Sequence, residues 1–342
     1  MKNYILSVGV GQYKNQGGEI ISLGNVPAND CNCLTKVLRS ELYGFDHIQE
    51  PLLNEHAICD AILAALDGLK EIEENSQVVI LFSGHGHYNP ELNMSYWLAH
   101  DAVPPSEYNH GLPPEEQGWV PASYIVSKVN TAGSHHVLIL ADCCFAGHML
   151  YNFRGIGTSL YPDYAKLAIQ RRSREILTSC SVAPVLSAVG ESGVSEFIEL
   201  VARKLEARNP HEVLCPQEIF AGLIGATRET PLYGHLQDGS EHGGCFLFAS
   251  EEQLEEIEEE QFEDENLVHH VVCKKLKDKL QPLNSNLDRG RYLKDFVGRQ
   301  WIFDEISEWI NKGRSPLFWL TGEPGIGKSA VSAYLTEHHA LV

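Results

Sequence analysis

The sequence predicts an α/β fold in which helices cover both faces of a mostly parallel sheet of six strands. The first observation is a pair of continuous apolar runs, 78–82 and 137–141. Such runs are typical of parallel strands that are buried on both faces. The second observation is that segments with apolar residues at helical spacing separate the apolar runs. Strands that alternate with amphipathic helices predict a layered α/β architecture.

The first elements are a strand and a helix. An apolar run predicts a strand at 4–10, and a loop containing Gly and Asn follows it. Leucine and valine residues at helical spacing then predict a helix at 34–42. Asn29 or Asp30 would cap this helix, since short polar side chains accept hydrogen bonds from the first free backbone N–H groups.

The next stretch leads to the second central strand. Its pattern predicts a short strand at 48–53, a helix at 58–72 and the buried strand at 78–82. Residues 88–118 are rich in Pro, Asn, Gly and acidic side chains without periodicity, which predicts a long surface loop beside a site. A helix at 124–129 then precedes the second apolar run.

The later part of the domain has four further elements. Irregular sequence continues through Tyr164, and a short apolar run predicts a strand at 176–178. Amphipathic patterns predict helices at 194–205 and 219–224, and a last strand is expected at 245–248.

Reactive side chains follow the two central strands. His85 comes directly after the first strand, whereas Asp142, Cys143 and Cys144 end the second. Because the carboxyl ends of parallel strands meet at one edge of a sheet, the His and a Cys would lie side by side. A thiol attacks as thiolate, and an imidazole can take its proton and return it to a leaving amine. The sequence therefore predicts a Cys–His site for acyl transfer.

These motifs resemble those of the caspase and metacaspase clan of cysteine peptidases. Ser-Gly-His-Gly at 83–86 is similar to the clan's His motif, and Asp-Cys-Cys-Phe-Ala-Gly at 142–147 is similar to its Asp-x-Cys-x-x-Gly motif. The resemblance covers roughly residues 1–250 and implies a caspase-like α/β sandwich. It also implies that the nucleophile is Cys144 and the base is His85, acting as a dyad. Phe-Ala stands where metacaspases usually have His-Ser after the Cys.

The neighbours of the dyad have predicted roles. The backbone N–H groups of Gly86 and Cys144 are candidates for an oxyanion hole, since small flanking residues let a carbonyl oxygen approach. Cys143 should point the opposite way along the strand, into the core. His87 and His135 are interpreted as surface histidines.

Two acidic residues are candidates for the substrate pocket. Asp142 lies two residues before Cys144, and Asp30 follows Asn29 in a position that is acidic in similar metacaspases. Both would line the S1 pocket and favour a cationic P1 side chain, Arg before Lys. The alternatives are a helix cap for Asp30 and a turn residue for Asp142.

The resemblance also places a linker in the sequence. Residues from Tyr151 to Glu175 correspond to the region between the large and small catalytic portions of caspases. We expect any self-cleavage there. The cluster Arg171–Arg174 within it is interpreted as a solvated basic face rather than a processing site.

Composition narrows the class of protein. The chain has 342 residues and a formal net charge of −20, which argues against nucleic acid as a partner. Nine cysteines without paired spacing fit a reducing compartment, so we expect a cytoplasmic protein. No apolar run approaches the roughly 20 residues that cross a bilayer, so no membrane partner is expected. Cys31 and Cys33 lack a second pair of ligands and are interpreted as packing residues, so no metal is predicted.

The charge and motifs suggest three segments. The peptidase-like segment spans 1–250, and an acidic linker or exposed helix spans 251–295. Ten carboxylates lie between Glu251 and Glu265. The sequence changes character again in a third segment, 296–342, where apolar spacing predicts an amphipathic helix before a strand.

The third segment contains a phosphate-binding motif. Gly-Glu-Pro-Gly-Ile-Gly-Lys-Ser at 322–329 matches the P-loop and follows a predicted strand. The nucleotide-binding residues would be Gly322, Gly325, Gly327, Lys328 and Ser329. Together with Phe-Val-Gly-Arg at 296–299, the motif resembles the start of a STAND or NACHT-like NTPase. Because 13 residues follow Ser329, we expect a fragment of that domain, with ATP and magnesium needed only by the complete domain.

The leading interpretation is a cytoplasmic cysteine endopeptidase that acts on protein or peptide substrates as the effector of an ATPase-regulated signalling or defence protein. The peptidase needs no cofactor, although dependence on calcium stays open. The NTPase region would drive self-association. The alternative is a catalytically inactive caspase-like interaction module of an ATP-dependent switch.

Overall fold

The computed structural model describes residues 1–14, 20–147, 165–180, 192–210, 212–236 and 244–259, together with Ile302 and Ile306. The chain divides into two compact units, Met1–Glu260 and Gln261–Val342. In the second unit, Ile302 and Ile306 are helical and buried, in agreement with the amphipathic helix expected there. All elements described below belong to the first unit.

A mainly parallel sheet forms the centre of the first unit, as the sequence predicted, but in the described residues it has seven strands rather than six. Its strands run in the order β10-β9-β8-β4-β1-β2, and β3 also pairs with β1. The strands are β1 (Lys2–Gly9), β2 (Asp46–His47), β3 (Leu52–Leu53), β4 (Ser76–Ser83), β8 (His136–Asp142), β9 (Ser173–Thr178) and β10 (Leu232–His235). Every pair is parallel except β10 with β9.

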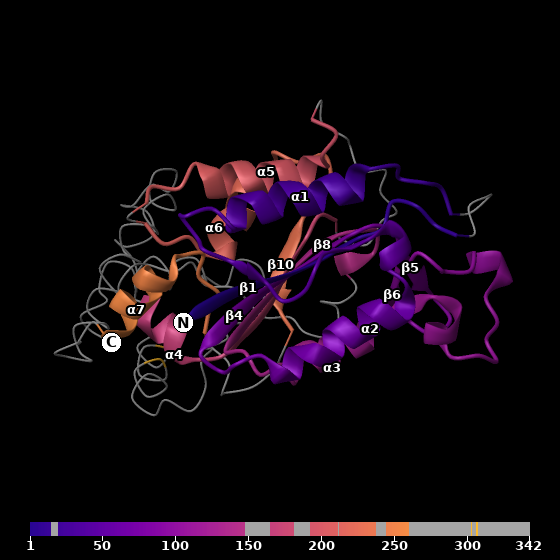
Figure 1. Cartoon of the computed structure of the whole chain (residues 1–342), viewed down its shortest axis with the longest axis horizontal. Helices are drawn as coiled ribbons and strands as arrows, with labels where there is room; N and C mark the ends of the chain where they lie inside the picture. The colour runs from indigo at the N-terminus through magenta and orange to yellow at the C-terminus, as the bar shows by residue number, and fades with distance from the viewer. Residues whose placement is uncertain are drawn as a thin grey trace. The chain divides into compact units, whose positions relative to one another are not determined.

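Helices cover both faces of this sheet (Figure 1). Val79 and Leu81 of β4 pack under α1 (Val26–Leu38), α5 (Glu196–Glu206) and α6 (Pro216–Leu223). The alternate residues Ile80 and Phe82 pack against α2 (Cys59–Gly68) and α3 (Ala122–Asn130) on the other face. Because successive side chains of a strand point to opposite faces, the fully apolar run of β4 contributes to both cores. The short 3₁₀ helix η2 (Leu69–Glu71) continues α2.

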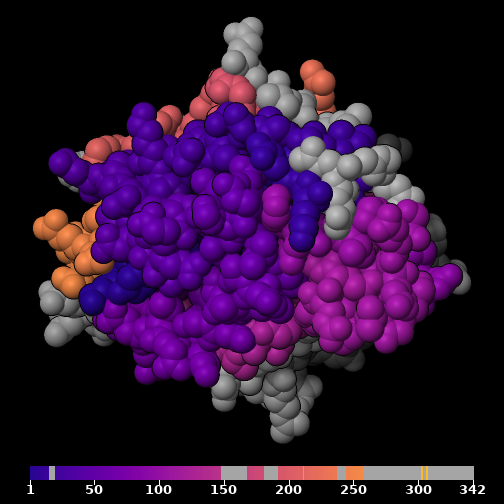
Figure 2. Space-filling view, turned by 45° about the vertical axis from the view of Figure 1, so that its right-hand side comes forward, coloured from indigo at the N-terminus to yellow at the C-terminus, as the bar shows by residue number. Residues whose placement is uncertain are grey.

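The expectation of a surface loop at 88–118 is wrong. This segment contributes most of a three-stranded antiparallel sheet, β5 (Gly86–Asn89), β6 (Met94–Leu98) and β7 (Trp119–Pro121). Two short 3₁₀ helices, η3 (Pro105–Glu107) and η4 (Pro114–Gln117), lie between β6 and β7. The segment forms the magenta region at the right of Figure 2. Its strands are short and widely separated in sequence, so their buried aromatic residues show no clear period.

Three other local expectations also need correction. Asn25 rather than Asn29 or Asp30 occupies the N-cap position of α1, which places Asp30 inside the helix. Of the strand expected at 48–53, only the last two residues form one, β3, and β2 lies just before the expected range. Residues 245–248 make a single bridge, Leu214 with Phe248, rather than a strand. Their alternate side chains still pack into two different apolar clusters, which explains the misleading pattern.

The basic cluster at the start of β9 is a solvated face only in part, because Arg171 is exposed whereas Arg172 is half-buried and Arg174 is buried. Arg174 is 1% exposed, and its guanidinium donates to the carbonyls of Ala132, Ser134, His135 and Ser173. Arg172 donates to the Gly133 carbonyl over 2.9 Å. Both residues therefore bind the free carbonyl groups that follow α3. Residues 151–164 of the expected cleavage region lie outside the described residues.

The acidic run begins as a helix. The helix α7 (Glu251–Glu259) buries Leu254 in a cluster with Ala168 and Ile169 of α4 (Ala165–Gln170). Its glutamates at 251, 252, 255 and 256 are exposed. Within the part of the chain that the structure describes, no helix is both long and apolar enough to cross a membrane.

Candidate active site

The turns after β4 and β8 run side by side. Ser83 is the register partner of Asp142, and the Gly84 N–H donates to the Asp142 carbonyl over 3.2 Å. Farther along, the rings of Tyr88 and Phe145 lie 5.9 Å apart. The structure therefore brings together the two motifs that carry His85 and Cys144.

Gly86 is the point of closest approach between the two turns. A Cβ atom at this residue would lie 1.9 Å from the carbonyl oxygen of Cys144 and 3.4 Å from the sulfur of Cys143. Since any side chain would collide with backbone, only glycine permits this approach. Gly86 and Cys144, the two residues expected to form an oxyanion hole, are thus in direct backbone contact.

His85 is held in one orientation by a backbone carbonyl. Its Nε2 lies 2.7 Å from the carbonyl oxygen of Ile21, and because a carbonyl only accepts, Nε2 carries the proton. In the neutral ring Nδ1 is then the unprotonated nitrogen. Burial lowers the pKa of His85 below its ordinary value, against the opposing effect of the Ile21 hydrogen bond. His85 is therefore neutral at pH 7 and able to accept a proton at Nδ1. The sequence pattern gave no signal for Ile21, because the contact is made by backbone.

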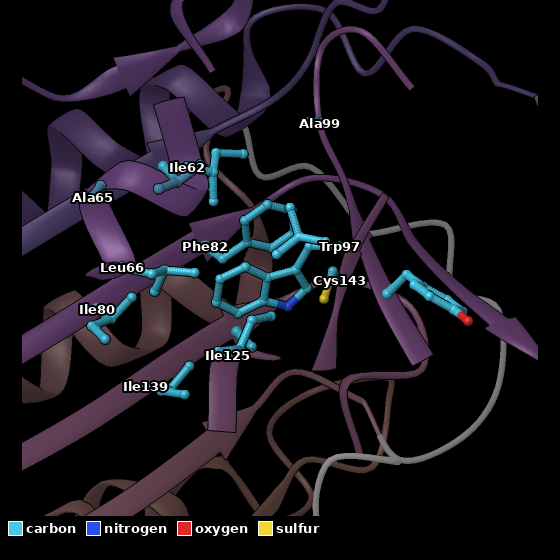
Figure 3. Close-up of a cluster of buried hydrophobic side chains, with 14 of the residues drawn as sticks. Ile62, Ala65, Leu66, Ile80, Phe82, Trp97, Ala99, Ile125, Ile139 and Cys143 are labelled. Carbon is cyan, nitrogen blue, oxygen red and sulfur yellow. The ribbon is translucent and has the colours of Figure 1, made fainter. Parts of the chain in front are cut away.

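The two adjacent cysteines have different surroundings. Cys143 is 4% exposed and lies beside the stacked rings of Phe82 and Trp97, whose centroids are 4.2 Å apart (Figure 3). Burial raises its pKa well above the ordinary value of a thiol. Cys144 is partly exposed, and Phe145 after it has a φ of 60°. The prediction that Cys143 points into the core is confirmed, which leaves Cys144 as the accessible thiol.

A third cysteine contacts the turn that carries Cys144. The thiol of Cys180, just beyond β9, donates to the Cys143 carbonyl over 3.2 Å. Its sulfur also interacts with the backbone amides of Phe145 and Ala146. Burial, followed by the neighbouring Cys144, raises the pKa of Cys180 to about 11, so this thiol stays protonated. Cys180 was not expected from the sequence, where it is one of several isolated cysteines.

The two candidate S1 carboxylates lie together on the α1 and α5 side of the sheet. Asp30 accepts a hydrogen bond from the Ser83 hydroxyl over 2.7 Å and another from the Ser195 N–H over 2.8 Å. Asp142 is 4% exposed, and within the described residues its Oδ2 accepts no hydrogen bond. Burial, and then the charge of Asp142, raise the pKa of Asp30 to about 7. Burial also raises the pKa of Asp142. At neutral pH the pair is therefore partly protonated: in a fraction of the molecules one of the two carboxyl groups carries a proton.

The other candidate residues are placed as follows. His87 and His135 are half-buried rather than fully at the surface, and the His87 ring lies 4.7 Å from that of Trp119. Cys31 packs in the core under α1. Among the described residues, no group of three or more His, Cys, Asp or Glu side chains is arranged to hold a metal ion. The predicted nucleotide-binding residues, 322–329, lie outside the described residues.

Comparisons with known proteins give limited similarities. A family model described as Nephrocystin 3, N-terminal, matches residues 298–340, a segment that includes the P-loop motif. No curated protein sequence is similar to the chain. The crystal structure of protein GSU0716 from Geobacter sulfurreducens is similar at a TM-score of 0.46 and 13% identity, covering 70% of this chain and 95% of that one.

A second solved structure is caspase-1 from Spodoptera frugiperda. It is similar at a TM-score of 0.40 and 11% identity, covering 73% of this chain and 92% of that one. At TM-scores this low, neither similarity by itself establishes a shared fold or activity.

Proposed function

We propose that the first unit is a caspase-like cysteine endopeptidase with Cys144 as nucleophile and His85 as general base. The observation that carries the proposal is the pairing of the two turns. An accessible thiol follows one buried strand, and a neutral imidazole follows its neighbour with its Nε2 proton already committed to the Ile21 carbonyl. Such an arrangement suits acyl transfer, because the base is oriented before substrate arrives.

In the proposed reaction, Nδ1 of His85 takes the proton of the Cys144 thiol. The thiolate attacks the substrate carbonyl, and the backbone N–H groups of Gly86 and Cys144 stabilise the oxyanion. The imidazolium then returns its proton to the leaving amine as the peptide bond breaks, which leaves a thioester on Cys144. Water, deprotonated by His85, hydrolyses the thioester and releases the new carboxylate.

The proposed specificity is for Arg, and then Lys, at P1. Asp30 and Asp142 form a buried acidic pair, and Asp142 Oδ2 is a carboxylate oxygen without a hydrogen-bond donor among the described residues. A guanidinium would supply both charge and donors in bidentate geometry. An aspartate at P1 would instead meet like charge in a desolvated site.

A fluorogenic peptide panel with Arg, Lys or Asp at P1 tests the activity. We expect turnover of the Arg peptide by the wild type, none by Cys144→Ala or His85→Ala, and substantial turnover by Cys143→Ala. If Cys143→Ala were the inactive variant, the motif would be misaligned by one residue. A wild type inactive on the whole panel, with Cys144 no more reactive towards iodoacetamide than the other cysteines, would favour an inactive interaction module.

The specificity has its own test. Asp30→Ala should raise KM for the Arg peptide while Cys144 keeps its rate of alkylation, since the pocket and the dyad are separate groups. Efficient cleavage after Asp by the wild type would contradict the acidic pocket.

For the second unit we propose nucleotide binding through Gly322, Gly325, Gly327, Lys328 and Ser329. The backbone of the glycine-rich loop would hold phosphates, Lys328 would reach the outer ones, and Ser329 would bind magnesium. Binding of a fluorescent ATP analogue with magnesium should be lost in Lys328→Ala. Equal binding by the variant and the wild type would contradict the proposal. Self-association of this region, coupled to the peptidase, would be the regulatory step.

A further inference from the structure

We propose that Tyr13 is a positioning residue for His85, an inference that rests on the peptidase function proposed above. The Tyr13 hydroxyl accepts a hydrogen bond from the backbone N–H of His85 over 2.8 Å. The same hydroxyl donates to the Val10 carbonyl over 2.9 Å. The two rings also lie 5.2 Å apart. Tyr13 therefore contacts both the backbone and the ring of the proposed base.

The chemistry of Tyr13 suits a positioning role rather than proton transfer. Its side chain is 2% exposed, and burial raises its pKa far above the ordinary value for tyrosine. The hydroxyl thus stays protonated across the pH range in which the protein is folded. Its proton is given to Val10, and its oxygen accepts from His85. The hydroxyl links the end of β1 to the His85 turn and takes no part in the chemical steps.

The loop after β1 holds His85 at two points. Tyr13 binds the His85 N–H, and Ile21, from the same loop, binds the ring at Nε2. Two contacts from one loop fix both the position of the backbone and the rotation of the ring, which a single contact would leave free.

The loop itself is anchored to the scaffold. The side-chain oxygen of Asn54, in the 3₁₀ helix η1 (Asn54–His56), accepts from the N–H groups of Gly11 and Gln12 over 3.0 and 3.1 Å. The Lys14 N–H donates to the His100 carbonyl over 2.7 Å. Because these anchors do not involve His85, they hold the backbone on both sides of Tyr13 independently of the base.

Tyr13→Phe tests the proposal, because it removes the hydroxyl and keeps the ring. Tyr43→Phe is the matched control: Tyr43 is 0% exposed, and its hydroxyl donates to the Leu205 carbonyl over 2.8 Å. Each variant removes a buried hydroxyl together with its contacts, to His85 and Val10 at Tyr13 and to Leu205 and Arg208 at Tyr43, but Tyr43 lies away from both catalytic turns. The two should therefore have similar losses of thermal stability.

The readouts are peptide hydrolysis and the pH dependence of iodoacetamide alkylation at Cys144. We expect Tyr13→Phe to lower kcat about tenfold with KM within about twofold, since the base is displaced and the substrate contacts remain. Alkylation of Cys144 near pH 7 should slow to a similar extent, with the midpoint of its pH profile shifted upward. Tyr43→Phe should match the wild type in kcat, in KM and in the alkylation profile of Cys144.

Equal kcat and equal alkylation profiles for the two variants would overturn the proposal. So would a loss of activity explained entirely by the unfolded fraction. The alkylation profile keeps this test separate from the proposed function. If the wild type cleaves no peptide, the peptidase proposal fails, and the positioning role is then decided by whether Tyr13→Phe alone shifts the reactivity of Cys144.

Discussion

The thiol of Cys180 donates a hydrogen bond to the carbonyl of Cys143 over 3.2 Å, which joins the end of β9 to the turn that carries Cys144. The same sulfur interacts with the backbone amides of Phe145 and Ala146, on the other side of Cys144. One buried side chain thus binds the backbone both before and after Cys144.

This contact predicts a difference between two substitutions at Cys180. Cys180→Ala removes the donor and the acceptor together and should lower kcat/KM by about three- to tenfold, the range expected for losing one or two weak hydrogen bonds. Cys180→Ser keeps both functions in its hydroxyl and should retain more activity. The measurement is peptide hydrolysis by the two variants at a temperature at which both are fully folded. Equal activities of the two variants would show that the hydrogen bonds do not position the turn.

Gly86→Ala should abolish the proposed peptidase activity. The added methyl group would lie 1.9 Å from the Cys144 carbonyl oxygen, so the two turns must separate by more than an ångström. Misplacement on this scale can cost about a hundredfold in rate. Gly68→Ala is the control, because a Cβ at Gly68 in α2 meets nothing within 4 Å. That variant should be fully active and more stable by up to about 1 kcal/mol, through better helix propensity.

The buried acidic pair predicts how stability depends on pH. The pKa of Asp30 is raised from 3.8 to about 7 in the folded chain, so between these values the folded state binds more protons than the unfolded state. The free energy of unfolding should therefore fall as pH rises through this window, by at most about 1.4 kcal/mol per pH unit from this group. Asp30→Asn cannot titrate, and it can still accept from the Ser195 N–H.

Urea unfolding at pH 5 and pH 8 measures this effect. We expect Asp30→Asn to gain stability relative to the wild type as pH rises. A difference between the two proteins that is constant with pH would contradict the raised pKa.

Arg174→Ala should be strongly destabilising. Its guanidinium donates to four backbone carbonyls over 2.8 to 3.2 Å. Removing it leaves three of them, Ala132, Ser134 and His135, with only the longer contacts to Arg172 or to the Ser173 N–H, and it empties the buried space that the side chain fills. We expect a loss of about 3 kcal/mol in the free energy of unfolding. Arg203→Ala is the control, since Arg203 is 68% exposed in an ion pair with Glu199 and should cost less than about 1 kcal/mol. Similar losses for both variants would show that Arg174 has no special structural role.

The sequence by itself determined the layered α/β class, the buried strands β4 and β8, and the burial of Cys143 beside a more exposed Cys144. Each of these follows from local physics. A continuous apolar run is stable only where both faces are covered, and alternation along a strand sends adjacent side chains to opposite sides. The His and the Cys each directly follow one of these apolar runs, so the sequence also placed them at the ends of neighbouring strands.

Only the tertiary structure decided the contacts that support those residues. Tyr13, the Ile21 carbonyl and Cys180 contact the turns that carry His85 and Cys144 across long sequence separations, through backbone groups or isolated side chains that form no pattern. Asp30 shows the same limit, because a short acidic residue before a helical run looks like a cap until packing places it inside α1, facing Ser83. The short strands β5 to β7 are stabilised by aromatic side chains that pack together only in the folded chain. The local sequence has no hydrophobic period from which this packing could be predicted.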